Sequence, residues 1–86
     1  MTGDMLWTSK TIGLCSNTFT MNGIIYYTDA AEGTLNGIDV ENGQKLMSIK
    51  SPDDYLDSPF FGNVVGKDGK IYVTSYLYIY CYKAVR

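Results

Sequence analysis

Histidine is absent from the chain, and cysteine and proline occur only twice each. Histidine is the side chain that most often acts as a general base near neutral pH, and it is a common zinc ligand. Its absence leaves carboxylates, lysine, tyrosine and the two cysteines for any catalysis. Those cysteines, Cys15 and Cys81, neither form a disulfide-dense scaffold nor show a CxxC spacing. The composition therefore disfavours a self-contained enzyme.

The chain also lacks a block of like charge and a long apolar run. Its net charge of -2 provides no electrostatic footprint for a phosphate backbone or an anionic membrane surface. No run approaches the roughly 18 apolar residues of a membrane span, and Asp4 stands where a signal peptide would begin its apolar region. We expect no nucleic-acid partner, no membrane insertion and a soluble, unprocessed chain, unless the sequence is a piece of a longer secreted protein.

Strand signals dominate what is present. Short runs rich in β-branched and aromatic residues alternate with Gly, Asn and Asp, and no window shows the 3.6-residue apolar period of a helix. Asn22-Gly23, Asn42-Gly43 and Asp68-Gly69 are dipeptides that tolerate positive φ and close tight hairpins. These signals predict an all-β chain, with strands at residues 5–8, 18–21, 24–28, 35–40, 45–49, 63–65, 71–75 and 77–82.

The sequence repeats internally. NGIIYYT at residues 22–28 recurs 46 positions later as DGKIYVT. LNGID at residues 35–39 matches IYCYK 44 positions later, and GDMLW at residues 3–7 matches GQKLM 40 positions later. Periods of about 40–50 residues are typical of β-propeller blades, which are four-stranded antiparallel meanders. We therefore interpret residues 1–86 as one region of two repeats, about 3–42 and about 43–86, that begins on the last strand of a blade.

The best-defined motifs resemble a known family. GTLNGIDVENGQKLM (residues 33–47) and NGIIYYTDA (residues 22–30) resemble the pyrroloquinoline-quinone-like (PQQ-like) β-propeller repeat, and DMLW (residues 4–7) fits the last strand of that repeat. The second repeat departs from the pattern, because IYCYK loses the aspartate and Met47 replaces the tryptophan. The resemblance covers nearly the whole chain as repeats, but not as a full protein.

The resemblance implies two antiparallel propeller blades that are out of phase with the chain by one strand. Two blades cannot close a ring, so we expect a fragment or a self-assembling part of a larger propeller. Three or four copies would give six or eight blades, within the usual range of about four to eight. The family includes quinoprotein dehydrogenases, outer-membrane assembly lipoproteins of the BamB type, and secreted or sensor propellers. Its usual setting implies a periplasmic or extracellular protein of the bacterial cell envelope.

The dehydrogenases of the family would imply an adjacent pair of cysteines and a calcium-binding carboxylate set, which this sequence lacks. We therefore predict no enzyme activity, no cofactor and no metal. Asp53, Asp54 and Asp57 are the only carboxylate concentration; their spacing matches no EF-hand loop and indicates a solvated acidic loop. Cys81 takes the place of Gly37 in the repeat, which indicates a small apolar filler.

Two groups of residues are candidates for contacts between blades or with a ligand. Trp7, Asp39 and Gly43 are the predicted structural, blade-docking residues, with the Asp39 carboxylate accepting backbone N–H bonds of the turn that follows. The tyrosines Tyr76, Tyr78, Tyr80 and Tyr82 form a possible ligand or partner face. Strand alternation puts Tyr78, Tyr80 and Tyr82 together, opposite Leu77, Ile79 and Cys81. We expect a structural and protein-interaction scaffold whose partners are other blades or copies of itself; the alternative is a carbohydrate- or peptide-binding module.

Overall fold

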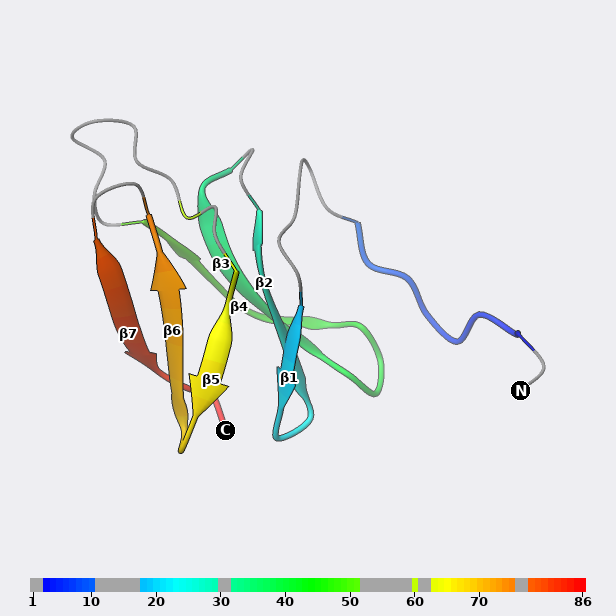
Figure 1. The fold of residues 1–86 in the computed structure, drawn as a ribbon. Helices are drawn as coiled ribbons and strands as arrows, with labels where there is room; N and C mark the ends of the chain where they lie inside the picture. The colour runs from blue at the N-terminus through cyan, green and yellow to red at the C-terminus, as the bar shows by residue number, and fades with distance from the viewer. Residues whose placement is uncertain (1–2, 11–17, 30–31, 52–59, 61–62, 76–77) are drawn as a thin grey trace.

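The computed structural model describes residues 3–10, 18–29, 32–51, 60, 63–75 and 78–86. These residues form strands and no helix, as the all-β prediction requires, and they accordingly contain no helix that could span a membrane. The strands are β1 (Phe19–Met21), β2 (Ile24–Asp29), β3 (Thr34–Asp39), β4 (Lys45–Lys50), β5 (Val65–Lys67), β6 (Lys70–Thr74) and β7 (Ile79–Lys83). They make two antiparallel meanders: sheet A, in the order β1-β2-β3-β4, and sheet B, in the order β5-β6-β7 (Figure 1).

Two of the predicted hairpin turns have the expected geometry. Asn22 and Gly23 have φ angles of 52° and 79°, and Asp68 and Gly69 have φ angles of 54° and 77°. Positive φ at both central residues is the requirement of the two-residue turn whose twist matches that of antiparallel strands. Tight turns at these two dipeptides are therefore confirmed.

The third turn differs from the prediction. At Asn42-Gly43 only Gly43 has positive φ, at 74°. The connection between β3 and β4 is longer than two residues, with the Gly43 N–H donating to the Asp39 carbonyl at 2.8 Å, and the β3–β4 register shifts between Gly37 and Ile38. A β-bulge of this kind offsets the pairing by one residue. The Asn42-Gly43 dipeptide therefore predicted the position of the turn correctly, but it did not predict the length of the connection between β3 and β4.

Most predicted strands are present, with ends that differ by one or two residues, but the strand expected at residues 5–8 is wrong. Residues 3–10 have no regular secondary structure. A strand is held by hydrogen bonds to a neighbouring strand, and among the described residues no strand pairs with this segment. In Figure 1 the segment, drawn in blue, lies on the side of sheet A away from sheet B.

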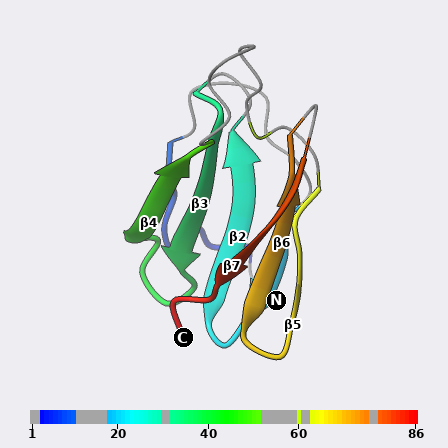
Figure 2. The same cartoon turned by 90° about the vertical axis from the view of Figure 1, so that its left-hand side faces the viewer.

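The two sheets pack face to face. Figure 2 shows sheet B nearer the viewer, with β4, β3 and β2 of sheet A behind or beside it. The buried core between the sheets contains Ile24, Tyr26, Leu35, Phe60, Val64, Ile71 and Val73. At Gly66 the backbone approaches so closely that an added Cβ would lie 2.7 Å from a ring carbon of Phe19. Burial of these apolar side chains is the main force that joins the two meanders.

The sequence offsets are also structural equivalences. Tyr26 pairs with Gly37 in sheet A, and Tyr72 pairs with Cys81 in sheet B. Likewise, Ile25 pairs with Ile38, and Ile71 pairs with Tyr82. The two sheets therefore have the same register at the same repeat positions. It follows that the face of sheet A that packs on sheet B corresponds to the face of sheet B that points away from sheet A.

Candidate interaction surfaces

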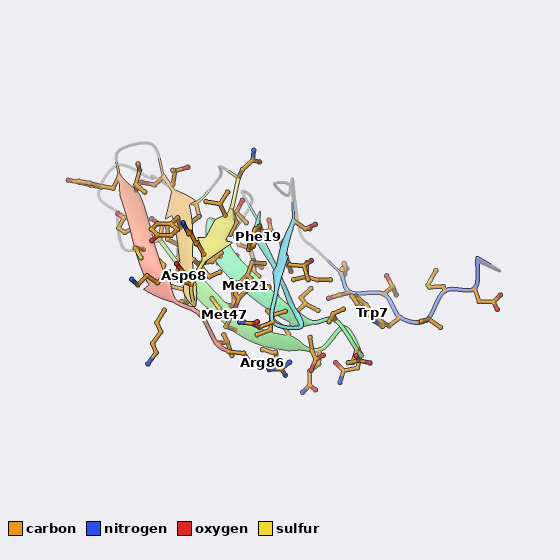
Figure 3. The ribbon with its side chains drawn as sticks, turned by 60° about the horizontal axis from the view of Figure 1, so that its bottom comes forward. Trp7, Phe19, Met21, Met47, Asp68 and Arg86 are labelled. Carbon is orange, nitrogen blue, oxygen red and sulfur yellow. The ribbon has the colours of Figure 1, made fainter. Side chains whose placement is uncertain are left out.

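Trp7 lies against the turn between β3 and β4 (Figure 3). Its indole Nε1 donates a hydrogen bond to the Val40 carbonyl at 3.0 Å. The ring lies so close to Gly43 that a Cβ there would lie 2.7 Å from the ring atom Cδ2. Only glycine leaves room for the ring, and the positive φ of Gly43 also favours glycine. The structure thus brings together two of the three predicted docking residues, although docking between blades stays a prediction.

Asp39, the third of these residues, holds the same turn and also joins the two sheets. Its Oδ1 accepts the Glu41 N–H at 2.9 Å, as the turn hypothesis predicts. Its Oδ2 accepts a hydrogen bond from the Arg86 guanidinium at 3.1 Å, and the two form an ion pair. The Glu41 N–H, followed by Arg86, lowers the pKa of the Asp39 carboxyl. The contact with Arg86 links the end of β3 to the chain that follows β7.

The residues after β7 make further contacts with sheet A that sequence reasoning missed. The Asn22 side-chain amide donates to the Arg86 carbonyl at 3.2 Å, and the Val85 N–H donates to the Tyr26 hydroxyl at the same distance. Residues 84–86 follow the last predicted strand and match no part of the repeat motif. No local signal in the sequence marked them, because their partners lie 47 to 64 positions away.

We expect Asp39 to make stability depend on pH in acid. Because its folded-state pKa lies below the ordinary 3.8, its contribution is present above the unfolded-state pKa and is lost as pH falls through the folded-state pKa. The Asp39→Asn variant should therefore be less stable than the parent at pH 7 and lose less stability below about pH 4. Urea midpoints between pH 7 and pH 2 measure both effects. Asp68→Asn, which makes the same substitution in a tight turn where the first repeat has Asn22, is the matched control. Equal pH dependence of Asp39→Asn and the parent would contradict the expectation.

Tyr80 and Tyr82 of β7 lie on one face of the strand, as the alternation predicted, and this face points toward the core. The Phe60 ring meets Tyr80 edge to face at 5.4 Å between centroids and meets Tyr82 in the same way at 6.1 Å. Both tyrosines are half-buried against the core, and burial raises the pKa of the Tyr82 phenol. Tyr78, at the start of the same face, is 58% exposed. Tyr76 lies outside the described residues. The positions of Tyr80 and Tyr82 favour packing between sheets over a role as a ligand platform.

The opposite side of sheet B, which we call the outer face, is made by Val65, Lys67, Lys70, Tyr72, Thr74, Ile79, Cys81 and Lys83. Val65 and Ile79 are 55% and 76% exposed, and Cys81 is an exposed free thiol. The interpretation of Cys81 as a filler is wrong for this chain, since nothing among the described residues covers it. Gly37, its equivalent, is buried, and an added Cβ there would lie 2.9 Å from Met47 Cγ. The difference between them is that a sheet covers Gly37.

The remaining predicted residues contribute little to a site. Cys15 and the cluster Asp53, Asp54 and Asp57 lie outside the described residues. Within the described ranges, no group of three metal-ligating side chains is close enough together to hold an ion. A comparison of the sequence with protein-family models and with curated proteins finds no match to either. The PQQ-like resemblance therefore rests on the repeat motifs of the chain itself.

Proposed function

We propose that this chain is a non-catalytic structural and protein-interaction scaffold built from two PQQ-like propeller blades. The observation that carries the proposal is the equivalence of the two sheets. The strands β5, β6 and β7 pair in the same register as β1, β2 and β3. The face of sheet A that packs on sheet B is equivalent to the face of sheet B that points away from sheet A. Further sheets can extend such a stack, because the exposed face of sheet B is equivalent to the face of sheet A that is buried between the sheets. Propellers satisfy such faces by continuing the stack around a ring.

The exposed surfaces of sheet B support this function. Its outer face carries Val65 and Ile79, both more than half exposed, and exposed large apolar side chains are candidates for a contact with another protein. In the described part of the chain, β7 has a neighbouring strand on one side only, so the other side offers unpaired backbone groups. The partners we propose are other propeller blades or copies of this chain, in the cell-envelope or extracellular setting that the resemblance implies.

Size-exclusion chromatography with light scattering tests the scaffold function. We expect the parent to have three or four times the mass of one chain, which gives six or eight blades. Ile79→Lys should dissociate the assembly, because a lysine charge in the centre of an apolar contact loses its hydration. Val85→Lys, which places the same charge at an exposed apolar position off the outer face, should leave the mass unchanged. A parent that is a clean, stable monomer would contradict the proposal.

A carbohydrate- or peptide-binding module is the second candidate, and the exposure of Tyr78 favours it. An aromatic ring that is 58% exposed can stack on a sugar ring or a peptide side chain. This function would require ligand binding that Tyr78→Ala abolishes without changing the unfolding midpoint. The scaffold function requires no such ligand.

A further inference from the structure

We propose that residues 3–10 of one copy form the fourth strand of sheet B in a second copy, beside β7, so that copies join head to tail. The inference rests on the proposed scaffold function and adds the segment and the register that make the joint. Among the described residues, sheet A has four strands and sheet B has three, although β5-β6-β7 follow the same meander as β1-β2-β3. In that part of the chain, sheet B has no equivalent of β4.

Residues 3–10 have the backbone and burial pattern of that missing strand. Gly3 and Gly43, which open the two matching segments, both have positive φ, at 83° and 74°. After them, Trp7 and Ser9 are half-buried between exposed neighbours, as Met47 and Ile49 are in β4. Met47 and Ile49 pack toward the core between the sheets, whereas Trp7 contacts the β3–β4 turn from the other side of sheet A. Residues 3–10 therefore pack on the outward face of sheet A in the same way that β4 packs toward sheet B.

The pairing within sheet A gives the register of the joint. In sheet A, Leu35 pairs with Ile49 and Gly37 pairs with Met47. Moving Leu35 and Gly37 forward by the offset of 44, and Ile49 and Met47 back by the offset of 40, places Ile79 of one copy opposite Ser9 of the next and Cys81 opposite Trp7. Both pairs lie on the outer face of sheet B. The contact then buries the indole ring, the thiol and the Ile79 side chain, which is 76% exposed in the single chain.

A second copy is needed because the chain does not bring its own segment to β7. Figure 1 shows sheet A lying between residues 3–10 and sheet B. Trp7 is held to the β3–β4 turn of its own sheet A by the hydrogen bond to Val40. Each copy thus presents a donor segment at one end and an acceptor edge at the other. Two different surfaces in contact make a head-to-tail interface, which closes into a ring when the rotation between copies permits.

The charged residues at the joint differ from those between the two sheets of one chain. Within the chain, Asp39 of sheet A pairs with Arg86, which follows sheet B. At the equivalent positions of the joint, Lys83 replaces Asp39 and Asn42, next to Glu41, replaces Arg86. Asn42 is uncharged, so the acidic residue that this register brings nearest to Lys83 of one copy is Glu41 of the next. An ion pair of this kind adds specificity more than affinity.

Disulfide trapping tests the register. In a Cys15→Ser, Cys81→Ser background, the double variant Ser9→Cys, Ile79→Cys should form disulfides between chains on mild oxidation. Directly opposed strand residues have Cβ atoms about 4.5–5.5 Å apart, and a small movement brings them within the roughly 3.5–4.5 Å that a disulfide needs. A non-reducing gel should show dimers and larger multiples that collapse on reduction. The matched control, Thr8→Cys with Ile79→Cys, places the two thiols on opposite faces and should cross-link at least about tenfold less. Refolding an equimolar mixture of the single Ser9→Cys and Ile79→Cys chains should give a mixed dimer, which shows that the bond joins two copies.

The outcomes separate this proposal from the scaffold function. If light scattering shows an assembly of the parent but both double variants cross-link equally or not at all, the copies join in another way and the strand proposal fails alone. If the parent is a stable monomer and no variant cross-links, both proposals fail. Urea unfolding of each cysteine variant in reductant verifies that it folds before the gel is interpreted.

Discussion

Replacing Phe60 with alanine is expected to lower the free energy of unfolding by about 3–5 kcal/mol, the usual cost of deleting a fully buried phenylalanine side chain. Phe60 is completely buried. Its ring also meets Tyr80 and Tyr82 edge to face, and aromatic pairs of this geometry add about 0.5–1.5 kcal/mol beyond the area that they bury. Since native proteins have only about 0.05–0.15 kcal/mol of stability per residue, a loss of this size removes a large part of the free energy of unfolding of a chain of 86 residues.

Urea unfolding followed by tryptophan fluorescence and circular dichroism measures this effect. Phe60→Leu retains most of the apolar volume and should lose less than half as much stability. Tyr78→Ala removes an aromatic side chain that is mostly exposed, and it should change the free energy of unfolding by less than about 1 kcal/mol. A loss at Tyr78→Ala as large as at Phe60→Ala would show that the packing between the sheets is not as described.

The same comparison decides between packing and ligand binding for the tyrosines. Tyr80 contacts Phe60 and the core, so Tyr80→Ala should destabilise the fold strongly. A Tyr80→Ala variant that kept its stability but lost a sugar or peptide ligand would favour the binding module instead.

The second large effect is expected at Gly37, where cysteine, the residue of the other repeat, should destabilise the chain by about 1–3 kcal/mol. An added Cβ would lie 2.9 Å from Met47 Cγ and 3.2 Å from Ile24 Cγ2. A thiol adds one more heavy atom to this closed space, so the side chains around it must shift from their preferred rotamers. Thermal unfolding in a reducing buffer measures the loss.

Cys81→Ala is the matched control, because Cys81 has the same repeat position and the same cross-strand tyrosine partner. In dilute monomer it is exposed, so the change should stay within about 0.5 kcal/mol. Equal losses at the two positions in monomeric protein would contradict the conclusion that one face is covered and the other is open.

Local chemistry explains why much of the fold could be predicted. The turns at Asn22-Gly23 and Asp68-Gly69 depend on residues that tolerate positive φ, a preference that acts within two positions. The alternation in β7 placed Tyr80 and Tyr82 on one face, and the burial of both agrees with it. These features need no knowledge of distant contacts.

The errors fall where a distant partner decides the outcome. Residues 3–10 carry the strand pattern of the repeat, but a strand also needs a neighbouring strand, and among the described residues no strand pairs with the segment. Cys81 has a small side chain, as a position packed under another sheet requires. Whether a sheet covers the position depends on a distant part of the chain, and local sequence does not show it. Arg86 had no motif to mark it, because its contact with Asp39 spans 47 positions.

The sequence by itself determined the all-β class, the two antiparallel meanders, two tight turns and the repeat register, because hydrogen-bonding periodicity and turn chemistry act over a few residues. Only the tertiary structure decided which face of each sheet is covered, where Trp7 lies and how Asp39 joins the sheets. Those features depend on the packing of segments that are distant in the chain, and apolar burial favours covering a face without specifying which segment covers it. The open outer face of sheet B is such a feature, and we propose that a second copy covers it.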